Sequence, residues 1–196
     1  EDRALTRARA LVAEMPDDPG LIMLQGMTEA AVGETEAAEA SFRRAVQIAP
    51  RFERAWTELI RNLYAQGRIE DVEIALAEGL EVLPEGLDLL WAQASFFERA
   101  GNFEEAIAVY ETLYERAPDS AVVANNLASL ISTYREDAES LERAYTIARR
   151  LRGSDVPQFQ DTYGWIAYRR GDYEDALENL MPAAAAMAEN PLVQFH

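Results

Sequence analysis

The sequence predicts an all-α solenoid of antiparallel helix-turn-helix hairpins with about eleven helices, and two regularities support this prediction. Four prolines, Pro16, Pro50, Pro84 and Pro118, lie 34 residues apart, and a fixed period of 20 to 50 residues is typical of repeat architectures. Within each period, apolar residues recur at the spacing of an amphipathic helix. The chain is therefore expected to stack similar helical units one after another.

Residues 87–120 show how one period is built. Apolar residues follow helical spacing up to Ala100, a Gly-Asn turn follows, and a second amphipathic run ends before Pro118. Gly101 suits the turn because glycine adopts positive φ without strain. Proline ends the second helix because it has no backbone N–H and clashes with the preceding turn. Each period is thus predicted to be one hairpin.

Small residues mark the expected contact between the two helices of a hairpin. In residues 163–177, Gly164 lies seven residues before the turn glycine, Gly171, and Ala176 lies five residues after it. The same spacing occurs at three earlier turn glycines, with a large residue, Ile60, in one copy. Glycine inside a helix costs about 1 kcal/mol relative to alanine. A close approach of the two helices would explain it.

The period divides the chain into one array over residues 1–196. Residues 1–18 fit the second helix of a partial repeat, complete repeats cover 19–52, 53–86, 87–120, 121–156 and 157–190, and residues 191–196 begin a truncated repeat. Both ends are in phase, which indicates a segment of a longer array with uncapped ends.

Two irregularities give local predictions. The repeat at 121–156 has no turn glycine and is two residues longer than the others, so we expect a longer or irregular connection between about 134 and 139. Pro182 lies within the second helix of the last repeat, which predicts a kink or a helix that starts afresh near residue 181.

The pattern resembles the tetratricopeptide repeat, a 34-residue helix-turn-helix unit, over essentially the whole chain. The third unit supplies the family's positions with Ala94, Phe97, Gly101, Ala106, Tyr110 and Pro118. The second unit departs from the family at Ile60, Val72 and Gly79. The resemblance implies a right-handed superhelical solenoid, whose first helices line the concave face and bind proteins without catalysis.

Eight residues on the expected concave stripe of the first helices are candidates for peptide binding: Arg54, Arg61, Tyr64, Trp91, Asn125, Ser129, Trp165 and Tyr168. Trp and Tyr combine apolar area with a polar edge, and Asn can both donate to and accept from a peptide backbone. The alternatives are that the tryptophans pack between hairpins and that the arginines pair with nearby carboxylates.

Composition narrows the classes of partner and reaction. The formal net charge of 18 minus 35, or −17, disfavours nucleic acid and favours a basic protein or peptide. The absence of cysteine excludes disulfides and thiolate metal sites. No apolar run reaches 18 residues, so this segment is not expected to insert into a membrane. The single histidine, His196, is interpreted as an ordinary helix residue, and no catalytic, cofactor or metal motif is recognised, so no enzyme activity is predicted.

The sequence therefore predicts a non-catalytic interaction scaffold that binds a peptide or protein segment in a concave groove. The alternative is a structural or assembly module that forms homo-oligomers through its uncapped ends or convex face. Residues 161–180 also resemble bacterial repeat proteins of envelope and exopolysaccharide export, which would imply a periplasmic parent protein. A cytoplasmic location fits the composition equally well.

Overall fold

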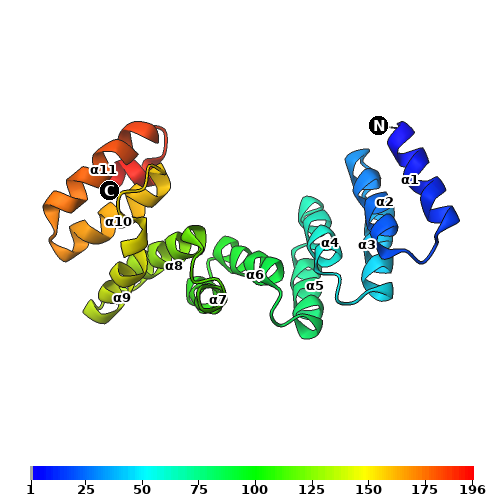
Figure 1. Cartoon of the computed structure of the whole chain (residues 1–196), viewed down its shortest axis with the longest axis horizontal. Coiled ribbons are helices and arrows are strands. Elements are labelled where there is room, and N and C mark those ends of the chain that lie inside the picture. The colour runs from blue at the N-terminus through cyan, green and yellow to red at the C-terminus, as the bar shows by residue number, and fades with distance from the viewer. Residues whose placement is uncertain (1) are drawn as a thin grey trace. The chain divides into compact units, whose positions relative to one another are not determined.

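The computed structural model describes residues 2–196, and within them it shows twelve α-helices, one 3-10 turn and no strand (Figure 1). The predicted all-α class is confirmed, with one helix more than the expected eleven. Contacts divide the chain into two compact units, residues 1–96 and residues 97–196, here called unit 1 and unit 2. The division falls inside helix α6 (Leu87–Ala100).

Unit 1 contains one single helix and two hairpins ahead of α6. Helix α1 (Asp2–Glu14) packs on α2 (Pro19–Ala31), which pairs with α3 (Thr35–Ile48). Helix α4 (Glu53–Ala65) then pairs with α5 (Ile69–Val82). The first helices α2 and α4 also contact each other, so successive hairpins stack in this unit.

Unit 2 repeats this arrangement. Helix α7 (Phe103–Arg116) packs on α8 (Ala121–Tyr134), which pairs with α9 (Ala138–Ala148) and the 3-10 turn at Arg149–Leu151. Helix α10 (Pro157–Arg170) pairs with α11 (Tyr173–Ala186), and the short α12 (Pro191–Phe195) contacts α11. The first helices α8 and α10 lie in contact, which places their candidate residues on neighbouring elements.

Three of the first helices begin with a proline. Pro19, Pro157 and Pro191 occupy the first turns of α2, α10 and α12, where the missing N–H costs nothing. Asp18 Oδ1 accepts a hydrogen bond from the Leu21 backbone N–H at 3.0 Å, which satisfies one free donor of α2.

The predicted close approach inside the hairpins is confirmed. A Cβ added to Gly164 would lie 2.8 Å from Leu180 Cγ, and one added to Gly26 would lie 2.7 Å from the Phe42 ring. Phe42 and Tyr163 are fully buried, so the hairpin interface is also the core. Gly171 has φ of 87°, in agreement with its predicted place in the turn.

The connection in the fourth hairpin differs from the prediction in length. Residues 135–137 join α8 to α9, and residues 66–68 join α4 to α5, so the two connections have the same length. The conformation does differ, because Arg135 is extended at φ −117° and ψ 132° where other hairpins have a glycine of positive φ. The predicted irregular connection is therefore confirmed, and it is not longer than the others, because the 3-10 turn and the residues after α9 absorb the additional length.

Of the two outcomes predicted at Pro182, the helix that starts afresh near residue 181 is wrong, and the kink stays a prediction. Helix α11 runs continuously from Tyr173 to Ala186 with Pro182 inside it. Pro182 is exposed and lies in the second half of the helix, where the surrounding backbone hydrogen bonds hold the helical path. Packing of Ala176, Asn179 and Ala183 against the hairpin core keeps the helix together on both sides of the proline.

Candidate functional site

The eight residues predicted from sequence fall into two sets of four. Arg54, Arg61 and Tyr64 of α4 and Trp91 of α6 lie in unit 1, whereas unit 2 contains Asn125 and Ser129 of α8 and Trp165 and Tyr168 of α10.

The arginines in unit 1 have different surroundings. Arg61 donates to Glu58 at 3.0 Å, and the Glu58 carboxylate is buried, so Arg61 serves as its counter-ion. Arg54 is exposed. Tyr64 is half-buried, and its ring centroid lies 6.4 Å from that of Phe96. Trp91, on the next first helix, α6, is also half-buried.

A chain of hydrogen bonds in unit 2 ends at one of the predicted residues. Asn125 Nδ2 donates to Asn126 Oδ1 at 3.2 Å, Asn126 Nδ2 donates to the Tyr110 hydroxyl at 3.0 Å, and that hydroxyl donates to Glu98 Oε1 at 2.7 Å. Tyr110 is fully buried in α7. The chain therefore links α8 to the core and fixes the orientation of both asparagine amides.

The far end of this chain has an unused acceptor. Asn125 Oδ1 is buried, and within residues 2–196 no donor lies at hydrogen-bond distance from it. A buried acceptor without a partner costs about 1–3 kcal/mol. Because Asn125 Nδ2 is already committed to Asn126, the amide cannot reverse without losing that bond. Asn125 Oδ1 is thus a buried acceptor whose hydrogen-bonding capacity is unused.

Aromatic rings on α10 lie near the end of unit 2. The Trp165 and Tyr168 rings stack with centroids 5.4 Å apart, and Trp165 also stacks on His196 at 4.2 Å with an angle of 14° between the planes. Tyr168 retains 49% of its surface exposed, whereas Trp165 is half-buried. Of the two aromatic candidates, Tyr168 offers the larger free surface.

A contact that sequence reasoning missed attaches α12 to α10. His196 Nδ1 lies 3.0 Å from Asp161 Oδ1, and both side chains are almost fully buried. The two residues are 35 positions apart and belong to no common motif, so only the packing of α12 across α10 reveals the pair. Its role is to hold α12 in place beneath Trp165.

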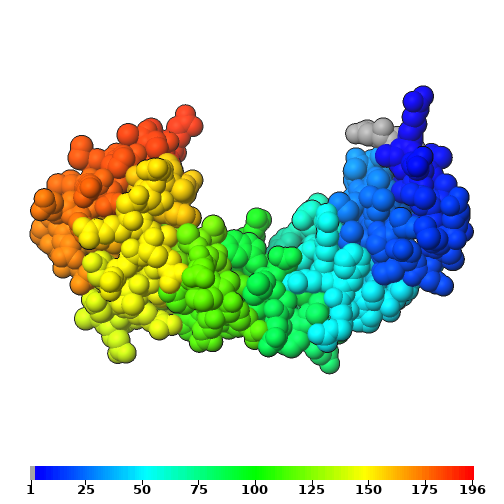
Figure 2. All heavy atoms as spheres, viewed as in Figure 1, coloured from blue at the N-terminus to red at the C-terminus, as the bar shows by residue number. Residues whose placement is uncertain are grey.

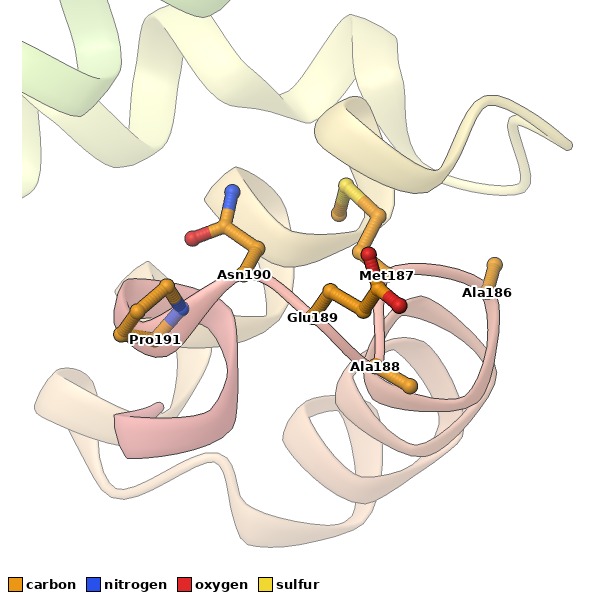
Figure 3. Close-up of a pocket in the computed structure, with 6 residues that line it drawn as sticks. All are labelled: Ala186, Met187, Ala188, Glu189, Asn190 and Pro191. Carbon is orange, nitrogen blue, oxygen red and sulfur yellow. The ribbon is translucent and has the colours of Figure 1, made fainter.

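The cavity at the connection between α11 and α12 does not form a chemical site (Figure 3). It is lined by Ala186, Met187, Ala188, Glu189, Asn190 and Pro191. Asn190 Oδ1 already accepts from the Leu192 backbone N–H at 3.1 Å as the cap of α12. Glu189 is the one ionisable residue in this lining, and nothing opposite it could act as its partner in acid–base chemistry.

Residues 2–196 contain no group of three or more His, Cys, Asp or Glu side chains arranged to hold a metal ion. Within the same part of the chain, no helix is both long and apolar enough to cross a membrane.

Stacked helical hairpins with polar and aromatic residues on the first helices of each unit define the chain as a helical-repeat scaffold. Models of the tetratricopeptide repeat match residues 20–52 and residues 57–121. The chain belongs to the tetratricopeptide repeat family. This fold generally mediates protein–protein interaction, and proteins built from it are generally non-catalytic scaffolds.

A curated relative supports the family assignment. A tetratricopeptide-repeat-containing protein of Pseudomonas aeruginosa is 30% identical over 113 residues, which cover 56% of this chain and 18% of that protein. The match therefore spans less than a fifth of the relative's length.

Solved structures share the fold at low identity. The pilF protein of Pseudomonas aeruginosa has a TM-score of 0.76 at 16% identity, covering 99% of this chain and 87% of that one. YrrB, described as a tetratricopeptide repeat protein with an unusual peptide-binding site, has a TM-score of 0.71 at 14% identity, covering 96% of both chains.

Proposed function

We propose that this chain binds an extended peptide segment of a partner protein along α8 and α10, with Asn125 contacting the peptide backbone. The observation that supports this most directly is the buried, unused Oδ1 of Asn125. A peptide N–H would satisfy it, and binding would recover the free energy that the free protein loses at this atom. Ser129, one turn further along α8, and the exposed Tyr168 of α10 would flank the peptide.

The charge of the chain favours a basic peptide. Its formal net charge of −17 attracts cationic segments and raises their association rate in a way that falls with ionic strength. In unit 1, the exposed Arg54 would instead bind a carboxylate of the peptide. The negative net charge of the chain and this arginine would therefore favour different groups on the peptide.

Selection from a library of random twelve-residue peptides tests the proposal. Peptides enriched on the chain would be titrated by fluorescence anisotropy against the unmodified protein, Asn125→Leu and a control, Thr133→Ala, an exposed position on the same helix. We expect Asn125→Leu to weaken binding at least about tenfold, equivalent to about 1.4 kcal/mol, and Thr133→Ala to leave it unchanged. Equal affinity of all three proteins would refute the role of Asn125.

Stability measurements separate a binding role from a structural one. Asn125→Leu removes a buried acceptor that has no partner, but it also removes the hydrogen bond from Asn125 Nδ2 to Asn126, so the free energy of unfolding should change by less than about 1 kcal/mol. A variant of nearly unchanged stability that binds less well is the expected signature of a site kept for a ligand. A loss of more than about 2 kcal/mol would mean that Asn125 serves the fold.

Self-association is the competing function, and light scattering distinguishes the two. A peptide-binding scaffold is expected to remain monomeric over the concentration range used. A dimer that is unaffected by Asn125→Leu would favour the assembly module.

A further inference from the structure

The hydrogen bonds between Asn125 and Glu98 all run in one direction. Asn125 Nδ2 donates to Asn126 Oδ1, Asn126 Nδ2 donates to the Tyr110 hydroxyl, and that hydroxyl donates to Glu98 Oε1. We call these four residues the polar chain. Helices α7 and α8, which carry Tyr110 and the two asparagines, pack against each other in the green part of the molecule (Figure 2).

The carboxylate at the end of the polar chain fixes the direction of each bond in it. An ionised carboxylate has acceptors only, so the single hydroxyl proton of Tyr110 must go to Glu98. The Tyr110 oxygen is then left as an acceptor, and Asn126 turns its Nδ2 towards it. Asn126 Oδ1 is in turn the acceptor for Asn125 Nδ2. The atom left over at the other end is the acceptor Asn125 Oδ1.

Packing alone does not select this direction. An asparagine amide has nearly the same shape when its oxygen and nitrogen are exchanged. In a reversed chain Tyr110 would donate to Asn126 and Asn126 would donate to Asn125, which would leave Asn125 Nδ2 over instead of Oδ1. That arrangement is unfavourable at its other end, because Glu98 and the Tyr110 oxygen would face each other as two acceptors 2.7 Å apart. The charge of Glu98 therefore decides which atom of Asn125 is left over.

We propose that Glu98 is a positioning residue that makes Asn125 an acceptor, so that the site takes an N–H group of the peptide and discriminates against an oxygen at the same place. The inference rests on the proposed function, because it names the ligand group that Asn125 recognises. Glu98 acts through Tyr110 and Asn126 and contacts no ligand. A peptide with an oxygen in place of this N–H would bring two acceptors together and leave both without a donor.

NMR of the free chain reports the direction of the polar chain. In the unmodified protein the Asn126 side-chain amide protons lie beside the Tyr110 hydroxyl, so we expect nuclear Overhauser effects between these protons and the Tyr110 ring. Glu98→Lys replaces acceptors by donors and should reverse the chain, which removes these signals. Glu98→Gln offers both a donor and an acceptor and should weaken them. Glu115→Gln, at an exposed position on α7, is the control and should leave them unchanged.

Peptides that differ in one atom test the ligand group. The probes are the tightest peptide from the twelve-residue selection and analogues in which each backbone N–H in turn is replaced by an ester oxygen. Against the unmodified chain, one analogue should bind at least about tenfold more weakly than the parent peptide. Against Glu98→Lys, the same analogue should bind within about threefold of the parent, because Asn125 would then present Nδ2. A purely structural role of Glu98 would weaken both peptides equally and leave their affinity ratio unchanged.

The outcomes separate this inference from the proposed function. Unchanged Overhauser effects in both Glu98 variants, or an affinity ratio that stays near tenfold in both, would overturn the role of Glu98. If no ester position weakens binding to the unmodified chain, the backbone contact at Asn125 is wrong, and the NMR comparison still decides whether Glu98 directs the polar chain. Circular dichroism would verify the helix content of each variant. If Glu98→Lys does not fold, the nearly isosteric Glu98→Gln decides alone.

Discussion

Gly164 of α10 lies against Leu180 of α11 so closely that a Cβ at residue 164 would be 2.8 Å from Leu180 Cγ. Real side chains do not tolerate this distance, so one of the two helices or the leucine would have to move. The glycine therefore sets the separation of the two helices in this hairpin, in the same way as Gly26 does against Phe42 in unit 1.

Gly164→Ala is expected to destabilise the protein despite the better helix propensity of alanine. The propensity gain is about 1 kcal/mol, whereas overfilling a packed interface costs about 1–3 kcal/mol. We expect a net loss of about 1 kcal/mol in the free energy of unfolding, measured by urea denaturation. In a Leu180→Ala background the same substitution should become neutral or stabilising. Additive effects of the two substitutions would contradict the proposed contact.

Glu53 at the start of α4 caps the helix of the next hairpin. Its Oε1 accepts from the backbone N–H groups of Asp88 and Leu89 at 2.8 Å and 3.1 Å, and a carboxylate at a helix N-terminus also interacts favourably with the helix dipole. Glu53→Ala should cost about 1 kcal/mol. Glu53→Gln keeps an acceptor oxygen but loses the charge, so its cost should be smaller. Hydrogen exchange of the Asp88 and Leu89 amides would check the local effect, and unchanged protection in Glu53→Ala would argue against the cap.

Ion pairing at Glu39 predicts a loss of stability in acid. Burial raises the pKa of Glu39, but hydrogen bonds from Arg43 and Arg68 outweigh burial and leave this pKa below its ordinary value of 4.5. A carboxyl whose pKa is lower in the folded state stabilises the fold above its unfolded pKa. That contribution is lost as the pH falls from about 4.5 through the lower folded value.

Urea denaturation at pH 7 and pH 3 would measure this contribution. Glu39→Gln should show a smaller decrease in the free energy of unfolding between the two pH values than the unmodified protein. Glu73→Gln, at an exposed position on α5, is the control and should retain the full decrease. An identical acid dependence for Glu39→Gln and the unmodified protein would exclude Glu39 as a contributor.

The hairpins could be predicted from sequence because their determinants recur at a fixed spacing. Gly164, Gly171 and Ala176 act within one hairpin, so counting residues is enough to find their contacts. The hydrogen-bond chain from Asn125 to Glu98 and the His196–Asp161 pair could not be found this way. The two ends of the chain are 27 residues apart and the members of the pair are 35 residues apart, and both depend on how each helix is rotated against its neighbour. Asn125 was still a candidate because asparagine is a poor helix former at the middle of a helix.

Sequence reasoning predicted a kink or a fresh helix start at the proline in α11, and the fresh start does not occur. Pro182 removes one backbone hydrogen bond, to the carbonyl of Glu178, yet the helix continues to Ala186. Ala183, directly after the proline, is completely buried, whereas Pro182 itself is exposed. The helix is therefore maintained by its buried side, at a local cost on its outer side.

Pro182→Ala is accordingly expected to stabilise the protein. Alanine restores the hydrogen bond from residue 182 to the Glu178 carbonyl and removes the ring clash, and the propensity difference sets an upper limit of about 3 kcal/mol. Because the exposed site needs no repacking, we expect a gain of about 1–2 kcal/mol in the free energy of unfolding. Ala185→Gly, at an exposed position one turn later, is the matched control and should lose about 1 kcal/mol. A loss of stability in Pro182→Ala would mean that α11 is adapted to a bend at the proline, and that its continuity does not depend on the buried side alone.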